Sequence, residues 1–332
     1  MKRALAKVLG GGRLDEAEAG AVMADIMDGE ATAAQIGALL AALAVRGESE
    51  DEVVGFARAM RSRAAPVTAQ GALDTCGTGG DGAQTFNIST VASLVIAACG
   101  VPVAKHGNRS SSGGCGSADV LEALGVRLDP GPGTVQRCID LAGWGFLFAP
   151  AFHASTRHAV GPRRELGVRT AFNLLGPLTN PAQPEAQVVG VPRAELVPLL
   201  ARCLRRLGVK RAFVVHGPGL DEIGLSGPTA VAAFDETGVR EFTLSPEDAG
   251  LGGAPIEALR GGDAAASARA ALDVLEGRPG PKRDVVLLNA AAGLLLARRA
   301  RDLKQGAGMA ADAIDSGRAA AVLARVKEIA TT

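Results

Sequence analysis

The chain has 332 residues, of which 47% are hydrophobic and 21% are charged, and its 35 lysines and arginines balance its 35 aspartates and glutamates. This length suggests about two domains, and this composition excludes a disordered protein. A zero net charge, no tyrosine, one tryptophan and nine phenylalanines argue against an extended nucleic-acid surface or an aromatic carbohydrate cleft.

The cysteines of the chain are odd in number and widely spaced, and they form no C-x-x-C pair. This pattern argues against a disulfide framework and a structural zinc site. The apolar stretches are too short to cross a bilayer, and the first residues lack a signal-peptide pattern. We therefore expect a cytoplasmic protein that binds neither nucleic acid nor membrane.

Residues 1–64 show only helical patterns. Three pairs resemble capping boxes, in which a side-chain oxygen takes a free N–H of the first turn and an acid or amide three residues on reaches back. These pairs are Asp15 with Glu18, Thr32 with Gln35, and Ser49 with Glu52. We predict a small all-helical domain over 1–64, followed by a hinge linker at 65–70.

Beyond residue 71 short β-rich runs alternate with helical stretches, which is typical of a mostly parallel sheet covered on both faces. The predicted strands are Leu73–Thr75, Val101–Ala104, Gly145–Phe148, Gln187–Val191, Ala212–Val215 and Val231–Phe234. Thr229–Leu244 is predicted as a hairpin at an edge of the sheet. The fold class is therefore α/β, with the helical domain joined to a larger α/β domain over 71–332.

A glycine-rich turn, Asp74–Gly82, follows the first predicted strand and precedes a helix. Such a turn can aim several backbone N–H groups at one anion. It lacks the Gly-Lys-Ser/Thr ending of a P-loop and the G-x-G-x-x-G spacing of a dinucleotide site. From the glycines alone, a flexible surface turn is the alternative.

Hydroxyl and amide side chains then gather at Thr85 and over Asn87–Thr90, where they can cap the next helix or bind phosphate and Mg²⁺. A second loop, Lys105–Asp119, combines two cations with serines and glycines, and Ser117 is placed to cap the helix that follows. A loop so rich in donors is typical of a lid that orders around a polyanion, whereas a solvated linker is the alternative.

These motifs together resemble the anthranilate phosphoribosyltransferase family. The resemblance rests on blocks in the same order along nearly the whole chain: G-T-G-G-D-G, N-I-S-T, K-H-G-N-R, G-S-A-D-V-L-E-A-L-G, F-A-P, R-R-E-L-G-V-R-T, F-N-L-L-G-P-L-T-N-P, and H-G with D-E. The resemblance implies transfer of phosphoribose from 5-phosphoribosyl-1-diphosphate (PRPP) to the amine of anthranilate in tryptophan biosynthesis. It also implies Mg²⁺, a homodimer formed through the helical domain, and a helical domain completed by helices near 163–180.

The resemblance assigns site residues position by position. PRPP would be bound by Gly77, Gly80, Asp81, Thr85, Asn87, Ser89, Thr90, Lys105, His106, Gly107, Asn108, Arg109, Ser110, Ser111, Ser112, Gly113 and Ser117. Mg²⁺ would be bound by Ser89, Asp221 and Glu222. Anthranilate would contact Gly77, His106, Asn108, His153 and Arg163. No dedicated general base is expected, because an aromatic amine is already unprotonated near pH 7.

The chain departs from the family pattern at two places. Gly113 and Gly114 remove a hydroxyl and a charge from the lid, next to Cys115, so we expect weaker PRPP affinity. Ala154 follows His153 where the family usually has proline, which alters the acceptor channel. The alternatives are a relative of the same fold that uses another aromatic acceptor and a non-catalytic relative that binds nucleic acid.

Overall fold

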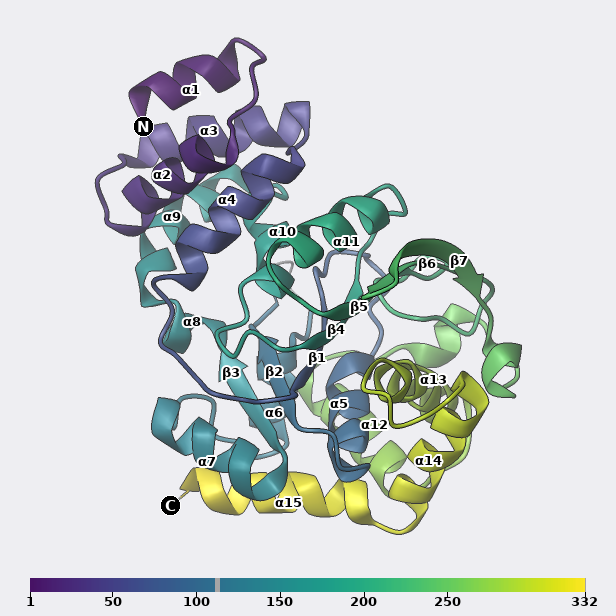
Figure 1. The fold of residues 1–332 in the computed structure, drawn as a ribbon. Coiled ribbons are helices and arrows are strands. Elements are labelled where there is room, and N and C mark those ends of the chain that lie inside the picture. Colours follow the sequence, from purple (N-terminus) through teal and green to yellow (C-terminus); the bar gives the residue numbers. More distant parts are fainter. Residues whose placement is uncertain (111–113, 332) are drawn as a thin grey trace.

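The computed structural model describes residues 1–110 and 114–331. Its N-terminal part is a helical bundle in which two later helices pack against the first four (Figure 1). The helices of the bundle are α1 (Lys2–Leu9), α2 (Glu16–Met27), α3 (Ala33–Arg46), α4 (Glu50–Arg61), α9 (Arg157–Leu166) and α10 (Ala171–Leu178). All three predicted capping boxes form, at the starts of α2, α3 and α4.

The second part is built on one seven-stranded sheet with the strand order β3-β2-β1-β4-β5-β6-β7. The first five strands in this order run parallel, whereas β6 and β7 form the antiparallel hairpin predicted at the edge. The strands are β1 (Leu73–Gly77), β2 (Val103–Gly107), β3 (Trp144–Phe148), β4 (Ala186–Gly190), β5 (Arg211–His216), β6 (Thr229–Asp235) and β7 (Gly238–Leu244). The sequence prediction of an α/β fold with a mostly parallel sheet is confirmed.

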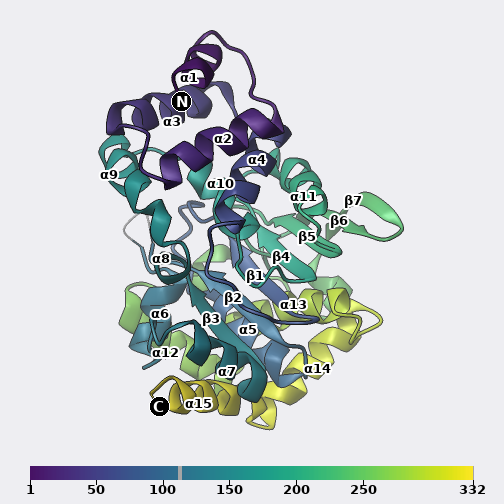
Figure 2. The same ribbon diagram turned by 60° about the vertical axis from the view of Figure 1, so that its left-hand side comes forward.

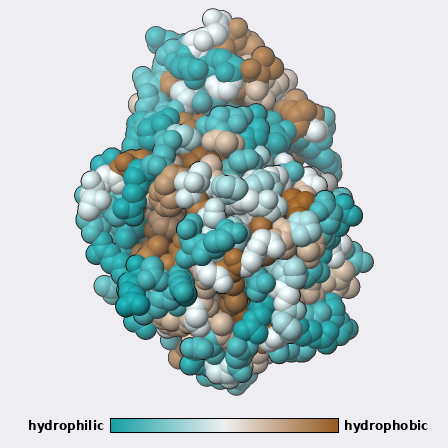
Figure 3. All heavy atoms as spheres, turned by 90° about the vertical axis from the view of Figure 1, so that its right-hand side faces the viewer, coloured by the Kyte–Doolittle hydropathy of each residue, from teal (hydrophilic) through white to brown (hydrophobic). Residues whose placement is uncertain are grey.

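Helices cover both faces of the sheet (Figures 1 and 2). The helices of this part are α5 (Ile88–Ala98), α6 (Ser117–Ala123), α7 (Pro132–Ala142), α8 (Ala149–Phe152), α11 (Leu196–Arg206), α12 (Ala264–Leu275), α13 (Pro281–Leu296), α14 (Leu303–Asp315) and α15 (Arg318–Thr331). Short 3₁₀ turns lie at Ala154–Thr156, Pro246–Ala249 and Ile256–Leu259. On the face that carries the β6–β7 hairpin, hydrophilic side chains cover most of the surface and hydrophobic ones appear in small areas (Figure 3). Within the described ranges, no helix combines the length and the apolar character that a membrane span needs.

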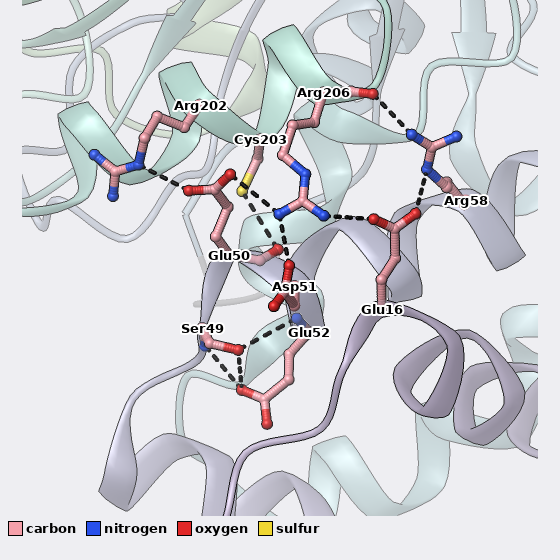
Figure 4. A network of polar contacts seen from close by, with 9 residues as sticks. All are labelled: Glu16, Ser49, Glu50, Asp51, Glu52, Arg58, Arg202, Cys203 and Arg206. Atoms are coloured by element: carbon pink, nitrogen blue, oxygen red, sulfur yellow. Dashed lines mark hydrogen bonds and ion pairs between the residues drawn. The ribbon is translucent and has the colours of Figure 1, made fainter.

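The helical bundle shares a hydrophobic core with one side of the sheet. One cluster of buried side chains runs from Ile26 and Phe56 in the bundle to Leu200 of α11 and Val214 of β5. A charged cluster lies beside this contact (Figure 4). In it, Arg206 of α11 pairs with Glu16 of α2 and with Glu50 and Asp51 of α4.

Residues 65–70 connect the two parts without regular secondary structure. The segment is fastened along its course: Ala65 N–H donates to the Phe152 carbonyl, and the Gln136 amide of α7 bonds both the N–H and the carbonyl of Thr68, at 2.9 and 2.7 Å. The domain limits and the hinge role of this segment stay predictions.

Candidate active site

A cavity of about 1130 Å³ opens at the carboxyl ends of β1 and β2, facing α9 and α10. In a parallel sheet this edge collects the loops that follow each strand, so it is the usual place for a ligand site. The loops after β1, β2 and β5 all reach this cavity. They bring Gly77, Gly107 and the pair Asp221-Glu222 to its wall.

The glycine-rich turn after β1 forms one end of the cavity. Gly79, Gly80 and Gly82 have φ values of 65, 79 and 76°, a left-handed region that suits glycine. The Gly79 N–H donates to Asp221 Oδ2 at 2.7 Å, and the Arg169 guanidinium donates to the Gly79 carbonyl. A Cβ atom on Gly80 would overlap that guanidinium, so the turn and Arg169 are packed as one unit.

The adjacent acids Asp221 and Glu222 lie in the wall, in contact with the first turn of α5. The Ser89 N–H donates to Glu222 Oε1 at 3.1 Å. Burial raises the pKa of Glu222 to about 7, although the nearby Lys105 opposes this rise. Burial and the charge of Glu222 also raise the pKa of Asp221 well above its usual value. The positive charge near the two carboxylates is therefore too small to offset their burial.

Lys105 of β2 lines the cavity, although only 1% of its surface is exposed. Its Nζ donates to the Thr75 carbonyl at 2.5 Å and to Ser89 Oγ at 3.2 Å. An ammonium has three N–H bonds, so one is left for a ligand. Burial lowers the pKa of Lys105, and the buried carboxylate of Asp74 opposes this change.

Four residues that line the cavity each have a buried side-chain atom with no hydrogen-bond partner among the described residues: Thr78 Oγ1, Asn87 Oδ1, Thr90 Oγ1 and His106 Nε2. Asn87 is the N-cap residue of α5, but its side chain makes no capping bond and instead donates to the Cys115 carbonyl. The interpretation of Asn87 as a side-chain cap is therefore wrong. Buried polar groups without partners are costly in a folded protein and are common where a polar ligand completes them.

The second loop lines the same cavity as the glycine-rich turn. The Arg109 guanidinium pairs with Asp119 and Glu122 at 2.8 and 2.9 Å, and both acids lie on α6. The predicted cap at Ser117 is wrong, because α6 begins at this residue and its hydroxyl donates to the Asn108 carbonyl. Asp119 takes the capping role instead, since its carboxylate accepts the Gly116 N–H at 2.9 Å.

The opposite wall is formed by α9 and α10. The Arg163 guanidinium lies 4.9 Å from the centroid of the Phe172 ring, and burial lowers the pKa of this arginine. No ion pair of Arg163 with a described acid is found. A half-buried guanidinium at a cavity without a carboxylate partner suits a carboxylate ligand.

Two histidines meet at the boundary between the cavity and the core. Their rings are 5.3 Å apart in an edge-to-face arrangement. His106 lines the cavity, whereas His153 is buried behind it and bonds the Thr179 carbonyl through Nε2 at 2.9 Å. The predicted anthranilate contact of His153 is therefore not a lining position in this structure, because the short helix α8 turns its end into the core.

The structure brings almost all predicted site residues to the one cavity. Those that line it are Gly77, Gly80, Asp81, Thr85, Asn87, Ser89, Thr90, Lys105, His106, Gly107, Asn108, Arg109, Ser110, Ser117, Arg163, Asp221 and Glu222. Ser111, Ser112 and Gly113 lie outside the described residues. Further lining residues that were not predicted from the sequence include Thr78, Gln84, Phe172, Gly176 and Asp263.

The family comparisons divide the chain as the structure does. Residues 2–64 match the helical bundle domain of a glycosyl transferase family, and residues 69–320 match the a/b domain of the same kind of protein. Fold and cavity thus define a glycosyl transferase with a helical bundle domain and an a/b domain.

Individual relatives give the narrower family. The anthranilate phosphoribosyltransferase of Moorella thermoacetica is 54% identical over 97% of this chain and 96% of its own length. The structure of the Thermus thermophilus protein of the same name superposes with a TM-score of 0.94, at 45% identity and 99% coverage of both chains. The Saccharomyces cerevisiae protein, in complex with PRPP and Mg, gives a TM-score of 0.90 at 27% identity, over 99% of this chain and 97% of its own. The chain belongs to the anthranilate phosphoribosyltransferase family.

Proposed function

We propose that this chain transfers the phosphoribosyl group of PRPP to the amine of anthranilate, giving N-(5-phosphoribosyl)anthranilate and diphosphate. The observation that carries the proposal is a cavity lined both by anion-binding groups and by Arg163, which lies beside the Phe172 ring and has no ion pair with a described acid. Family membership supports the choice of these two substrates. The reaction is a step of tryptophan biosynthesis.

The polyanionic donor fits the side of the cavity formed by β1, β2 and α5. Lys105 and the hydroxyls of Ser89 and Thr90 stand where α5 begins, and the positive end of its helix dipole adds to the attraction for phosphate. Asn87 and Thr78 supply polar atoms that lack partners among the described residues. On the proposed function, these groups bind PRPP and hold its ribose in reach of the acceptor.

A divalent cation fits the acidic pair. Within the described ranges, His, Cys, Asp and Glu side chains form no group of three or more that could hold a metal ion unaided. Mg²⁺ takes oxygen ligands and is usually bound by one or two carboxylates together with water and substrate phosphate. Asp221, Glu222 and the Ser89 hydroxyl are oxygen donors of this kind, and the raised pKa values of both acids reflect burial with too little counter-charge. When bound, Mg²⁺ would neutralise negative charge on the departing diphosphate.

The acceptor fits the wall made by α9 and α10. Arg163 would bind the carboxylate of anthranilate with its two-pronged guanidinium, while Phe172 supports the arginine from one face. Asn108, directly after β2, faces the same cavity. The arrangement holds the amine of the acceptor against the ribose rather than activating it.

His106 is unsuited to serve as a general base. Its Nδ1 lies 3.0 Å from the Gly176 carbonyl, so Nδ1 carries the proton and Nε2 is the unprotonated nitrogen. Burial, with the nearby His153, lowers the pKa of His106 to about 3. A nitrogen with this pKa can accept a hydrogen bond from the amine but holds a proton poorly at neutral pH.

The test is a turnover assay with the full chain, PRPP, Mg²⁺ and anthranilate, followed by the loss of anthranilate fluorescence. Turnover that needs all three components supports the proposal. Turnover with other substituted benzoates but not anthranilate would favour a relative with a different acceptor. No turnover with any acceptor, together with salt-dependent DNA binding, would favour a non-catalytic relative.

We also propose that the protein is cytoplasmic and forms a homodimer through the helical bundle. Val45 at the end of α3 is 91% exposed, and Leu9 of α1 and Val160 of α9 are 63 and 54% exposed. A second copy packed on the bundle would cover apolar side chains such as these. Light scattering of the wild type and of Val45→Asp tests this: a dimer that dissociates in the variant supports it, and a monomeric wild type contradicts it.

A further inference from the structure

The wall of the acceptor side depends on a short helix whose carboxyl end is buried. Helix α10 has eight residues and carries Phe172, Asn173, Gly176 and Pro177 to the cavity. The last carbonyls of any helix lack partners within the helix, and a helix this short has little stability of its own. Its place therefore depends on what bonds its last turn.

Side chains from several elements bond the carbonyls of this last turn. Thr179 Oγ1 donates to the Leu175 carbonyl at 2.9 Å, and His106 donates to that of Gly176. Gln187 of β4 donates to the Pro177 carbonyl at 3.0 Å, and the His153 ring bonds the Thr179 carbonyl.

The remaining carbonyl, that of Leu178, is bonded by the charged donor of the set. Arg61, the last residue of α4, donates from Nε to Leu178 O at 2.7 Å and from Nη1 to Leu207 O, just beyond α11, at 2.9 Å. Its Nη2 is buried and has no hydrogen-bond partner among the described residues. A cation at the carboxyl ends of two helices is favoured by both helix dipoles.

The position of Arg61 is costly for a residue that serves stability alone. Burial lowers its pKa to about 10, and the like charge of Arg58 contributes to this lowering. A buried cation without an acid and with an unbonded nitrogen opposes folding. What the chain gains is a link from the end of α4 to the carboxyl end of α10 and to the residue after α11.

We propose that Arg61 is a positioning residue for the acceptor pocket: by bonding the carboxyl end of α10 it fixes the helix that carries Phe172 and Pro177 to the cavity. The inference rests on the proposed function, since it assigns the α10 wall to anthranilate. It predicts that replacing Arg61 weakens the binding of the acceptor. The binding of the donor, on the side formed by β1, β2 and α5, should not change.

The experiment compares two arginines that lie one turn apart on α4. Arg58 donates to the Arg206 carbonyl of α11 at 2.9 Å and pairs with Glu16, so it also ties the bundle to α11, but no bond to the described α10 residues is found for it. Arg61→Gln and Arg61→Lys are measured beside Arg58→Gln in the full-length protein. The readouts are the separate KM values for anthranilate and PRPP, kcat, and calorimetric binding of PRPP with Mg²⁺.

Arg61→Gln should raise the KM for anthranilate at least tenfold and leave the KM for PRPP and the calorimetric affinity within twofold. Arg61→Lys keeps a charged donor and should recover part of the loss. Arg58→Gln should leave both KM values within twofold.

Three results overturn the inference: an unchanged anthranilate KM in folded Arg61→Gln and Arg61→Lys, an equal rise in both KM values, or the same effect in Arg58→Gln. If Arg61→Gln does not fold, Arg61→Lys alone decides, and an anthranilate KM within twofold of wild type overturns the inference. A wild type that fails to turn over anthranilate refutes the proposed function instead, so the two failures are distinguishable.

Discussion

The guanidinium of Arg163 lies at the cavity wall, 4.9 Å from the ring centroid of Phe172. The two residues come from different helices, α9 and α10, so the contact exists only when both helices are in place. An aromatic face attracts a cation and restricts the motion of its side chain.

Phe172→Leu should therefore raise the KM for anthranilate about 2- to 30-fold, the range that loss of such a contact produces. Phe148→Leu is the matched control, because the Phe148 ring lies 5.9 Å from the other cavity arginine, Arg109. Its effect should fall on PRPP. Steady-state kinetics with each substrate varied separates the two, and a reversed pattern would contradict the assignment of the two sides.

Asp221→Asn with Glu222→Gln should lower kcat at least about 100-fold, because the leaving diphosphate loses its cation. The same variant should keep its fold, and its unfolding temperature without Mg²⁺ should match or exceed that of the wild type, since the repulsion between two buried carboxylates is gone. Mg²⁺ titration by calorimetry in the presence of PRPP checks the binding. Undiminished turnover would show that the metal assignment is wrong.

The stability of the metal-free protein should fall as pH rises towards 7. The pKa of Glu222 is about 7 in the fold and near 4.5 in the unfolded chain, so between these values the folded state binds more protons. The free energy of unfolding then decreases with pH across this window. Mg²⁺ stabilises the ionised acids, so it should raise the unfolding temperature more at pH 8 than at pH 5. Thermal scans at both pH values, with and without Mg²⁺, measure this. Equal Mg²⁺ shifts at both pH values would argue against it.

Gly114→Lys should lower the KM for PRPP about 2- to 5-fold by adding a cation beside the cavity. Among the described residues, a Cβ atom at this position would meet Ser110 Oγ at 3.7 Å, which is an ordinary contact. Gly114→Ala separates the charge from the stiffening of the loop. If alanine alone gives the full effect, the cause is loop entropy rather than charge. Gly113→Ser, which restores a hydroxyl to the loop, should also lower the KM for PRPP. Gly113 lies outside the described residues.

The charged cluster between the bundle and α11 should contribute modestly to stability. Arg206→Met removes three ion pairs and should cost about 0.5–2 kcal/mol, whereas Arg202→Met removes its one pair, with Glu50, and should cost less. Urea unfolding at low and high salt measures both, and the difference between the variants should shrink at high salt. No difference at low salt would mean that the cluster contributes nothing.

Local patterns in the sequence predicted much of the fold. The capping boxes at Asp15, Thr32 and Ser49 need only four residues each, and strand–helix alternation needs only short windows, so both could be recognised. The exact caps of α5 and α6 could not, because Asn87 and Ser117 found distant or competing partners.

That residues of the two glycine-rich loops line one cavity could be predicted, because they are close together in sequence within each loop. The acceptor side could not be completed in the same way. Phe172 and Gly176 reach the cavity because of how α10 is placed, and Arg61 acts on it from a position 117 residues before its partner Leu178. Gly262 and Asp263 line the cavity from a segment in which the sequence shows no recognisable motif. Such long-range contacts leave no local pattern to read.

The hydrophobic cluster that joins Phe56 of the bundle to Val214 of the sheet has one more consequence. Removal of residues 1–64 would leave the outer surfaces of α10 and α11 facing water, so a truncated a/b fragment should associate or precipitate rather than survive alone. The intact chain should accordingly melt in a single calorimetric step, with both parts lost together.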